Sequence, residues 1–297
     1  MVAILRTEHL ARSFGRIHAV KDVSLQVEEG DLYGLLGQNG AGKTTTIRMI
    51  LRLIRPSAGR TELFGLDVGR HFIEVMSRIG ALVELPAYYP HLSAAKNLEI
   101  IRMLTPGVPD GRIREVLEQV GLGSRGDDHV RTYSQGMRQR LGIAMAILHK
   151  PRLVILDEPT NGLDPGGINH IRGLIKDLNK NDGVTFVISS HLLHEIEITC
   201  NRVAIIKQGE LLVQETVSGL LSKTANVLRV EAEPKAQARE LLAKLAADVR
   251  ENDDGSLGAK ADPAKHAEIV AELVKAGIAV RSFAAQRMTL EEYFLTH

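Results

Sequence analysis

The sequence contains one cysteine, Cys200, and no tryptophan in 297 residues. A single thiol excludes an internal disulfide bond and a metal site built from several thiolates, and it is typical of a protein in a reducing cytosol. Neither charge sign is in excess, because 37 Lys and Arg residues face 36 Asp and Glu residues, a formal net charge of +1. Such a chain has no global field that attracts nucleic acid or anionic lipid.

Long apolar runs are also lacking. No stretch approaches the roughly 20 apolar residues that span a bilayer, and the segment Met1 to Arg6 has no apolar core of a signal peptide. We therefore expect that, if this protein functions at a membrane, it does so by binding a membrane protein. The length, with 44% hydrophobic and 25% charged residues, predicts one large α/β domain and a small second one.

Residues 1–221 alternate between strand and helix patterns. Residues 23–27 alternate apolar and polar side chains and predict one half-buried strand ending at Gly30, and residues 32–36 predict the next. Helical spacing follows from Gly42 to Ile54, and helical patterns dominate a subdomain of about residues 85–150, where Ser93 is a cap. Further strands are expected at 153–156, 184–188, 203–206 and 211–213, with a helix over 168–178. This alternation predicts a mainly parallel sheet.

The pattern changes near residue 222, so we expect residues 222–297 to form a small α+β accessory domain. Its expected elements are a strand at 227–230, a helix at 236–247, a turn at 252–255, a helix at 264–276 and a strand at 278–282. Thr289 and Glu292 form a capping box for a last helix, 290–295.

A phosphate-loop pattern, G-x-x-x-x-G-K-[ST], is present as Gly37, Gln38, Asn39, Gly40, Ala41, Gly42, Lys43 and Thr44. Small residues let backbone N–H groups turn toward phosphate oxygens, and the following helix directs its positive end at the anion. Lys43 is expected to reach the β and γ phosphates and Thr44 to ligate Mg²⁺, with Thr45 also at the nucleotide. A chance glycine-rich turn is the alternative, but the required strand and helix flank the loop.

Two carboxylates follow the apolar run 153–156, at a strand end where open α/β sheets bind ligands. Asp157 is expected to hold Mg²⁺ through water. Glu158 is expected to position or deprotonate the water that attacks the γ-phosphate. The alternative is an acidic turn after a core strand.

Three more segments resemble motifs of ABC transporter ATPases, in the order found in that family. Residues 132–140 resemble the signature motif, 161–165 the D-loop and 189–191 the switch histidine, while Phe14 stands where an aromatic ring stacks on adenine. The resemblance covers about residues 4–220. It implies a P-loop NTPase of the ABC type, an α/β fold with a mixed sheet and a helical subdomain.

The resemblance also implies ATP and Mg²⁺ as cofactors and a head-to-tail dimer with two ATPs between the copies. Each site would combine catalytic and signature residues of different copies: Lys43, Asp157, Glu158 and His191 from one, Ser134 and Gly136 from the other. Asp164 would communicate across the interface, and closure would exclude water. The remaining partner would be a separate integral membrane permease, which places the chain at the cytoplasmic face of the membrane. Three purely structural interpretations stay open: Phe14 as a core aromatic, His191 as an ordinary strand-end histidine and Ser134 as a helix cap.

The sequence departs from the family pattern at two places. Ser134, Gln135, Gly136 and Met137 replace the usual Ser-Gly-Gly-Gln, and Glu84 stands where a glutamine normally touches Mg²⁺, with no glutamine anywhere in 79–97. A carboxylate can ligate Mg²⁺, but it adds negative charge beside the phosphates unless the metal or a proton offsets it. This form resembles the ATPases of bacitracin-resistance and lantibiotic-immunity exporters, which implies export of a peptide antibiotic, drug or lipid-like substrate. Drift to a solvated surface glutamate is the alternative.

Other functions remain as alternatives. A soluble ABC ATPase acting on ribosomes or DNA is disfavoured by the single cassette and the near-neutral charge, so no nucleic acid is expected as a partner. A non-catalytic nucleotide sensor would lack Glu158 or Lys43, and both are present. Import stays open because the membrane subunit decides the direction.

Overall fold

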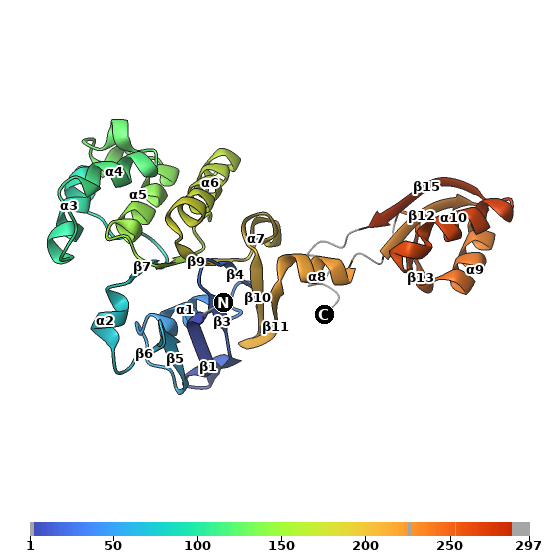
Figure 1. The fold of residues 1–297 in the computed structure, drawn as a ribbon, viewed down its shortest axis with the longest axis horizontal. Helices are drawn as coiled ribbons and strands as arrows, with labels where there is room; N and C mark the ends of the chain where they lie inside the picture. The colour runs from blue at the N-terminus through green and yellow to red at the C-terminus, as the bar shows by residue number, and fades with distance from the viewer. Residues whose placement is uncertain (1–2, 225–226, 253, 287–297) are drawn as a thin grey trace. The chain divides into compact units, whose positions relative to one another are not determined.

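The structure is a computed structural model that describes residues 3–224, 227–252 and 254–286. The chain divides into two compact units, residues 1–215 and 216–297 (Figure 1). Each unit has its own sheet and its own apolar core. Within the described ranges, no helix combines the length and the apolar character needed to cross a membrane.

The first unit is built on an eleven-stranded sheet, in the order β6-β5-β1-β2-β11-β10-β4-β9-β8-β7 with β3 paired to β1. Its strands are β1 Ala3–Phe14, β2 Ile17–Val23, β3 Gln26–Glu28, β4 Leu32–Leu36, β5 Ala58–Leu63, β6 Leu66–Asp67, β7 Ile79–Leu82, β8 Leu153–Asp157, β9 Thr185–Ser190, β10 Arg202–Lys207 and β11 Glu210–Thr216. Its α-helices are α1 Lys43–Ile50, α2 Phe72–Met76, α3 Ala94–Leu104, α4 Arg112–Gln119, α5 Gln135–Ile147, α6 Pro165–Asp182 and α7 Leu193–Thr199.

The strands that lead to the expected site are parallel. Neighbouring pairs run in the same direction from β10 through β4, β9 and β8 to β7. Every residue of β8 and β9 is buried, as expected for strands covered on both faces. Their carboxyl ends therefore meet at one edge of the sheet.

β11 pairs parallel with β2, but the part of the sheet around β1 and β5 is antiparallel. The prediction of a mainly parallel sheet is wrong for that part, and the mixed sheet implied by the resemblance is confirmed. β1 pairs antiparallel with β2, β3 and β5, and β5 with β6. Only Gly15 and Arg16 connect β1 to β2, and a two-residue loop joins antiparallel strands. The single strand expected over 23–27 is also two strands, although Val23, Leu25 and Val27 are buried as their alternation predicts.

The helix after the phosphate loop is shorter than its apolar pattern predicts. It ends at Ile50 and not at Ile54. Arg52 has a φ of 57°, a left-handed conformation that cannot continue an α-helix.

Helices α3, α4 and α5 gather on one side of the first unit (Figure 1). Ser93 caps α3, accepting a hydrogen bond of 3.2 Å from Lys96 N. The carboxyl end of α5 is held from two directions. The buried Arg112 guanidinium of α4 donates to the carbonyls of Ile147 and Leu148, each at 3.1 Å. His149, just beyond α5, places Nε2 3.1 Å from the carbonyl of Ile79 in β7.

The second unit contains α8 Val217–Thr224 and an antiparallel four-stranded sheet with the order β13-β14-β12-β15. Its chain order is β12 Val227–Glu233, α9 Lys235–Leu245, β13 Ala247–Glu251, β14 Leu257–Lys260, α10 His266–Lys275 and β15 Ala279–Gln286. This βαββαβ arrangement is the ferredoxin-like, split βαβ motif. The helix expected over 236–247 ends at Leu245, because Ala247 begins an edge strand. The capping box of Thr289 and Glu292 and the helix 290–295 lie outside the described residues.

Candidate active site

The phosphate-loop segment connects the buried strand β4 to α1. Gly40 and Gly42 have φ values of 81° and 107°, which side-chain-bearing residues rarely adopt. A Cβ on Gly42 would lie 2.6 Å from the carbonyl oxygen of Ala19 in β2. The loop is therefore folded directly against the β1–β2 hairpin. The turn is closed by Ala41 N, which donates to Gln38 O at 3.1 Å.

Lys43 is buried at the centre of this loop, with 5% of its side chain exposed. Its Nζ donates to the carbonyl oxygens of Gly37 at 2.7 Å and Gln38 at 3.3 Å. It also lies 3.2 Å from Oε1 of Glu158. A buried ammonium with neutral carbonyl partners and one carboxylate is suited to an anionic ligand.

The ends of β8 and β9 bring together the two carboxylates and the histidine named from the sequence. Asp157 is paired in register with Ser189, whose hydroxyl donates to Oδ1 of Asp157 at 2.5 Å and accepts from Glu158 N at 2.9 Å. Nδ1 of His191 lies 2.7 Å from Oε2 of Glu158. Glu158 has a φ of 50°, so its position depends on these contacts.

Sequence reasoning missed the role of Ser189. It named the run Ser189 to His191 but assigned chemistry only to the histidine. The sequence showed a polar residue at the end of an apolar strand, but only the pairing of that strand with β8 places Ser189 beside Asp157.

A cavity of about 610 Å³ adjoins these groups. Thr44 and Glu84 line it together with Asp157 and Glu158, and the remaining lining residues are Leu85, Pro86, Tyr88, Gln135, Arg138, Gln139, Asn161 and Gly162. Glu84 also forms an ion pair with Arg48 of α1. The three side chains expected at Mg²⁺, those of Thr44, Glu84 and Asp157, therefore line the same cavity.

These residues fit a metal that arrives with a nucleotide. Among the described residues, no group of three or more His, Cys, Asp or Glu side chains is arranged to hold a metal by itself. Mg²⁺ in nucleotide sites takes one or two carboxylates and fills its other positions with phosphate oxygens and water. The Thr44 hydroxyl and the carboxylates of Asp157 and Glu84 match that donor set.

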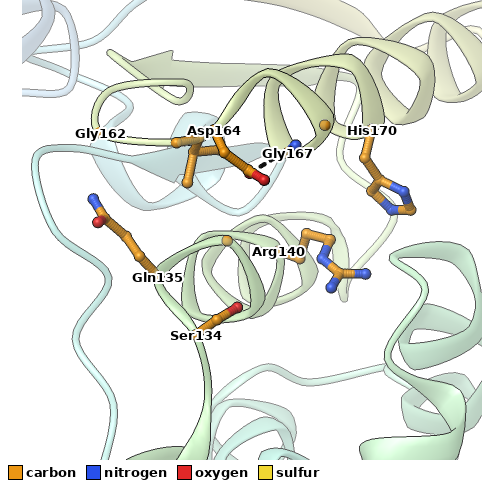
Figure 2. Close-up of a pocket in the computed structure, with 10 residues that line it drawn as sticks. Ser134, Gln135, Arg140, Gly162, Asp164, Gly167 and His170 are labelled. Atoms are coloured by element: carbon orange, nitrogen blue, oxygen red, sulfur yellow. Dashed lines mark hydrogen bonds between the residues drawn. The ribbon is translucent and has the colours of Figure 1, made fainter.

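The signature residues line a second cavity, of about 470 Å³, between the amino ends of α5 and α6 (Figure 2). Ser134 caps α5, accepting from Met137 N at 3.3 Å, and Asp164 caps α6, accepting from Gly167 N at 3.0 Å. Gly136 lines the same space. The cap role considered for Ser134 is therefore present, and it leaves the hydroxyl at the cavity wall.

Gln135, one of the two departures from the usual motif, lines both cavities. Its Nε2 donates to the carbonyl of Asn161 at 3.3 Å. Gly162 has a φ of 72°, and a Cβ on it would lie 2.4 Å from that Nε2 atom. Gln135 thus connects the signature segment to the D-loop segment of the same chain.

Phe14 ends β1 and is 45% exposed, which excludes the core-aromatic interpretation. The guanidinium of Arg12 lies 4.6 Å from its ring centroid, a cation–π arrangement. The hairpin that carries Phe14 is the one whose Ala19 backs the phosphate loop.

A phosphate loop between a buried strand and a helix, with two carboxylates at the end of another parallel strand of the same sheet, defines a P-loop NTPase. A family model described as "ABC transporter" matches residues 20–161. The bacitracin transport ATP-binding protein BcrA of Bacillus licheniformis is 39% identical over 297 residues, covering 99% of this chain and 97% of that protein. The uncharacterized ABC transporter ATP-binding protein YdbJ of Bacillus subtilis (strain 168) is 39% identical over 292 residues, covering 98% of this chain and 94% of that protein.

Solved structures agree with this assignment. The dimeric post-hydrolysis structure of the ATP-binding cassette MJ0796, bound to ADP and Pi, superposes with a TM-score of 0.64 at 26% identity. The match covers 72% of this chain and 98% of that one. The chain belongs to the ATP-binding proteins of ABC transporters, and it is an ABC-type ATPase.

Proposed function

We propose that this chain is the ATP-hydrolysing subunit of an exporter that removes a peptide antibiotic, a drug or a lipid-like molecule. It acts at the cytoplasmic face of the membrane through a separate integral membrane permease. The observation that carries the proposal is the cluster of Lys43, Glu158 and His191 at the ends of β8 and β9, in a chain similar over its whole length to a bacitracin transport protein.

The cluster supports a hydrolytic role for each member. Lys43 exchanges its carbonyl partners for the β and γ phosphates of ATP. Glu158 orients the attacking water and accepts its proton as the oxygen bonds to the γ-phosphorus and the bond to ADP breaks. His191 holds the Glu158 carboxylate in place through Nδ1. Removal of one such preorganised group costs an enzyme about 100- to 1000-fold in turnover.

Mg²⁺ bound with ATP would neutralise charge on the β and γ oxygens. Thr44, Asp157 and Glu84 are the side chains that would hold it. Ser189 orients the Asp157 carboxylate by its 2.5 Å hydrogen bond, which leaves the other oxygen for a metal-bound water.

A head-to-tail pair of copies would complete the site. Ser134 and Gly136 would then meet the γ-phosphate on the other copy with a hydroxyl, a backbone N–H and the amino end of α5. The 470 Å³ cavity that exposes these groups supports this arrangement, and Asp164 lies on its opposite wall (Figure 2). Phe14, with its exposed ring, would stack on adenine.

Exposed apolar side chains support a protein partner near the Glu84 loop. Leu85 and Tyr89 are 82% and 53% exposed, and Met103 and Leu104 at the end of α3 are 73% and 76% exposed. Large apolar side chains exposed to this extent are candidates for contact with a protein partner.

Affinity purification of the tagged chain from gently solubilised native cells tests the proposal. We expect a stoichiometric integral membrane protein to copurify, as identified by mass spectrometry. Cells that carry Glu158→Gln should lose resistance to the exported compound, with bacitracin-type peptides as the first probes. Recovery with ribosomal or DNA-bound proteins, and no membrane protein, would refute the transport role.

A further inference from the structure

The carboxylate of Glu84 is paired with the guanidinium of Arg48, a residue in the last turn of α1. The two side chains are 60% and 38% exposed, and exposed pairs of this kind contribute little to folding stability. The effect of the pair is therefore to fix the position of the Glu84 carboxylate.

Arg48 and Thr44 are four residues apart in α1, so they share one face of that helix, about 6 Å apart. Thr44 and Glu84 line the same cavity as Asp157. The Glu84 carboxylate is therefore paired with a residue on the helix face of Thr44, whose hydroxyl is expected at Mg²⁺, and it borders the same cavity as that hydroxyl. A change of side-chain rotamer can turn the Glu84 carboxylate from Arg48 toward this cavity.

The backbone at Glu84 supports a defined position for this residue. Its φ is 62°, a left-handed conformation that a residue with a long side chain adopts only where its surroundings hold it.

We propose that Arg48 is a positioning residue that competes with the nucleotide-bound Mg²⁺ for the Glu84 carboxylate. Glu84 is paired with Arg48 when the metal is absent and turns to the metal when Mg-ATP binds. Arg48 thereby offsets the charge that a glutamate, unlike the usual glutamine, places beside the phosphates. Its guanidinium, once released, remains in the last helical turn, where the helix dipole favours a cation. The proposal rests on the nucleotide site proposed above.

Nucleotide binding tests this role without relying on turnover. A fluorescent ATP analogue is titrated into the Arg48→Gln chain, first in EDTA and then with increasing Mg²⁺. Without metal, we expect affinity to fall about three- to fivefold, because the Glu84 charge is no longer offset. The Mg²⁺ concentration that gives half of the maximal increase in affinity for the ATP analogue should also fall about three- to fivefold, because the metal no longer displaces an arginine. A merely structural defect would weaken both metal and nucleotide binding.

The Glu84→Gln background separates the proposed competition from a direct effect of Arg48 on the phosphates. In that background, adding Arg48→Gln should change neither the affinity for the ATP analogue without metal nor the half-maximal Mg²⁺ concentration. An equal change in both backgrounds would overturn the proposal. Arg78→Gln is the matched control, because it removes an ion pair with Glu74 whose partners are 40% and 50% exposed.

Failure of the nucleotide site and failure of the role of Arg48 give different binding results. If the unchanged chain binds no ATP with or without Mg²⁺, the nucleotide site itself is refuted. If ATP binds normally but Arg48→Gln leaves the Mg²⁺ dependence unchanged, only the role of Arg48 is refuted.

Discussion

Lys43 and Glu158 neutralise each other in this structure, with Nζ of the lysine 3.2 Å from Oε1 of the glutamate. One comes from the helix after the phosphate loop and the other follows β8. In the proposed reaction, the γ-phosphate would meet a cation that attracts it and a carboxylate that repels it. Lys43 would then exchange its contact with Glu158 for the phosphate, which leaves the Glu158 carboxylate free to orient water.

Replacement of the proposed base is the first prediction. Glu158→Gln keeps the size of the side chain and a partner for His191, but it cannot accept a proton. We expect ATP turnover to fall at least about 100-fold and the variant to form an ATP-bound dimer, as measured by size-exclusion chromatography with light scattering in Mg-ATP. Glu74→Gln, at an exposed acid, is the control. A Glu158→Gln chain that stays monomeric in Mg-ATP would contradict the sandwich arrangement.

Lys43→Ala removes the cation from the phosphate loop. We expect phosphate release to fall by about 100-fold or more, because no other group of the loop supplies a charge to the γ-phosphate. Lys96→Ala removes a lysine outside the site and should leave phosphate release unchanged. Retained turnover in Lys43→Ala would show that the loop does not bind the reacting phosphate.

Gly162→Ala should destabilise the D-loop segment. The new Cβ would lie 2.4 Å from Nε2 of Gln135 at a φ of 72°, and left-handed backbone alone costs a residue with a Cβ about 1–2 kcal/mol. A lower denaturant midpoint is the expected result. Adding Gln135→Ala should recover the part of the loss that comes from the clash.

Gly173→Ala provides the matched control for that substitution. Gly173 lies inside α6, and a Cβ added there would have no heavy atom within 4 Å apart from the neighbouring backbone of its own helix. We expect a gain of about 0.5–1 kcal/mol from the helix propensity of alanine. Equal losses from both substitutions would indicate that the contact with Gln135 is unimportant.

The stability of the first unit should decline on mild acidification in part through His149. Burial lowers the pKa of this imidazole from its ordinary 6.5, so the unfolded chain binds the proton more readily than the folded chain. The stabilising contribution is complete above pH 6.5 and is lost as the pH falls from there through the lowered pKa. The denaturant midpoint at pH 7.5 and pH 5.5 measures this loss.

His149→Gln removes the titration and keeps an N–H near the Ile79 carbonyl. The difference in midpoint between the two pH values should therefore be smaller in this variant. The same difference in both chains would show that other groups account for the acid sensitivity.

The buried parallel strands were predictable from the sequence because each is a nearly continuous apolar run. β4, β8, β9 and β10 are found where such runs predict them. β1 carries no comparable signal, because the left-handed residue His9 and register shifts between Leu10 and Ser13 interrupt its alternation. β13 is an edge strand with mostly exposed residues, so its composition differs little from that of a loop.

The residues of the site were predictable from motif chemistry, but their contacts were not. The pairing of Arg48 with Glu84, and of Ser189 with Asp157, joins residues far apart in the chain. Such contacts follow from the way the sheet and α1 pack, which no local pattern of residues encodes. The contact from Gln135 to Asn161 belongs to the same class.

Because the carboxyl end of α5 is held in place, a small rotation of this helix about that end moves its amino end by a large distance. Arg112 holds that end, while Ser134 stands at the other. Thirteen residues give a rod of about 20 Å. Turning such a rod by about 10° displaces its free tip by about 3 Å, which is the full length of a hydrogen bond. In the proposed head-to-tail pair, a tilt of this size would decide whether Ser134 reaches a phosphate on the other copy.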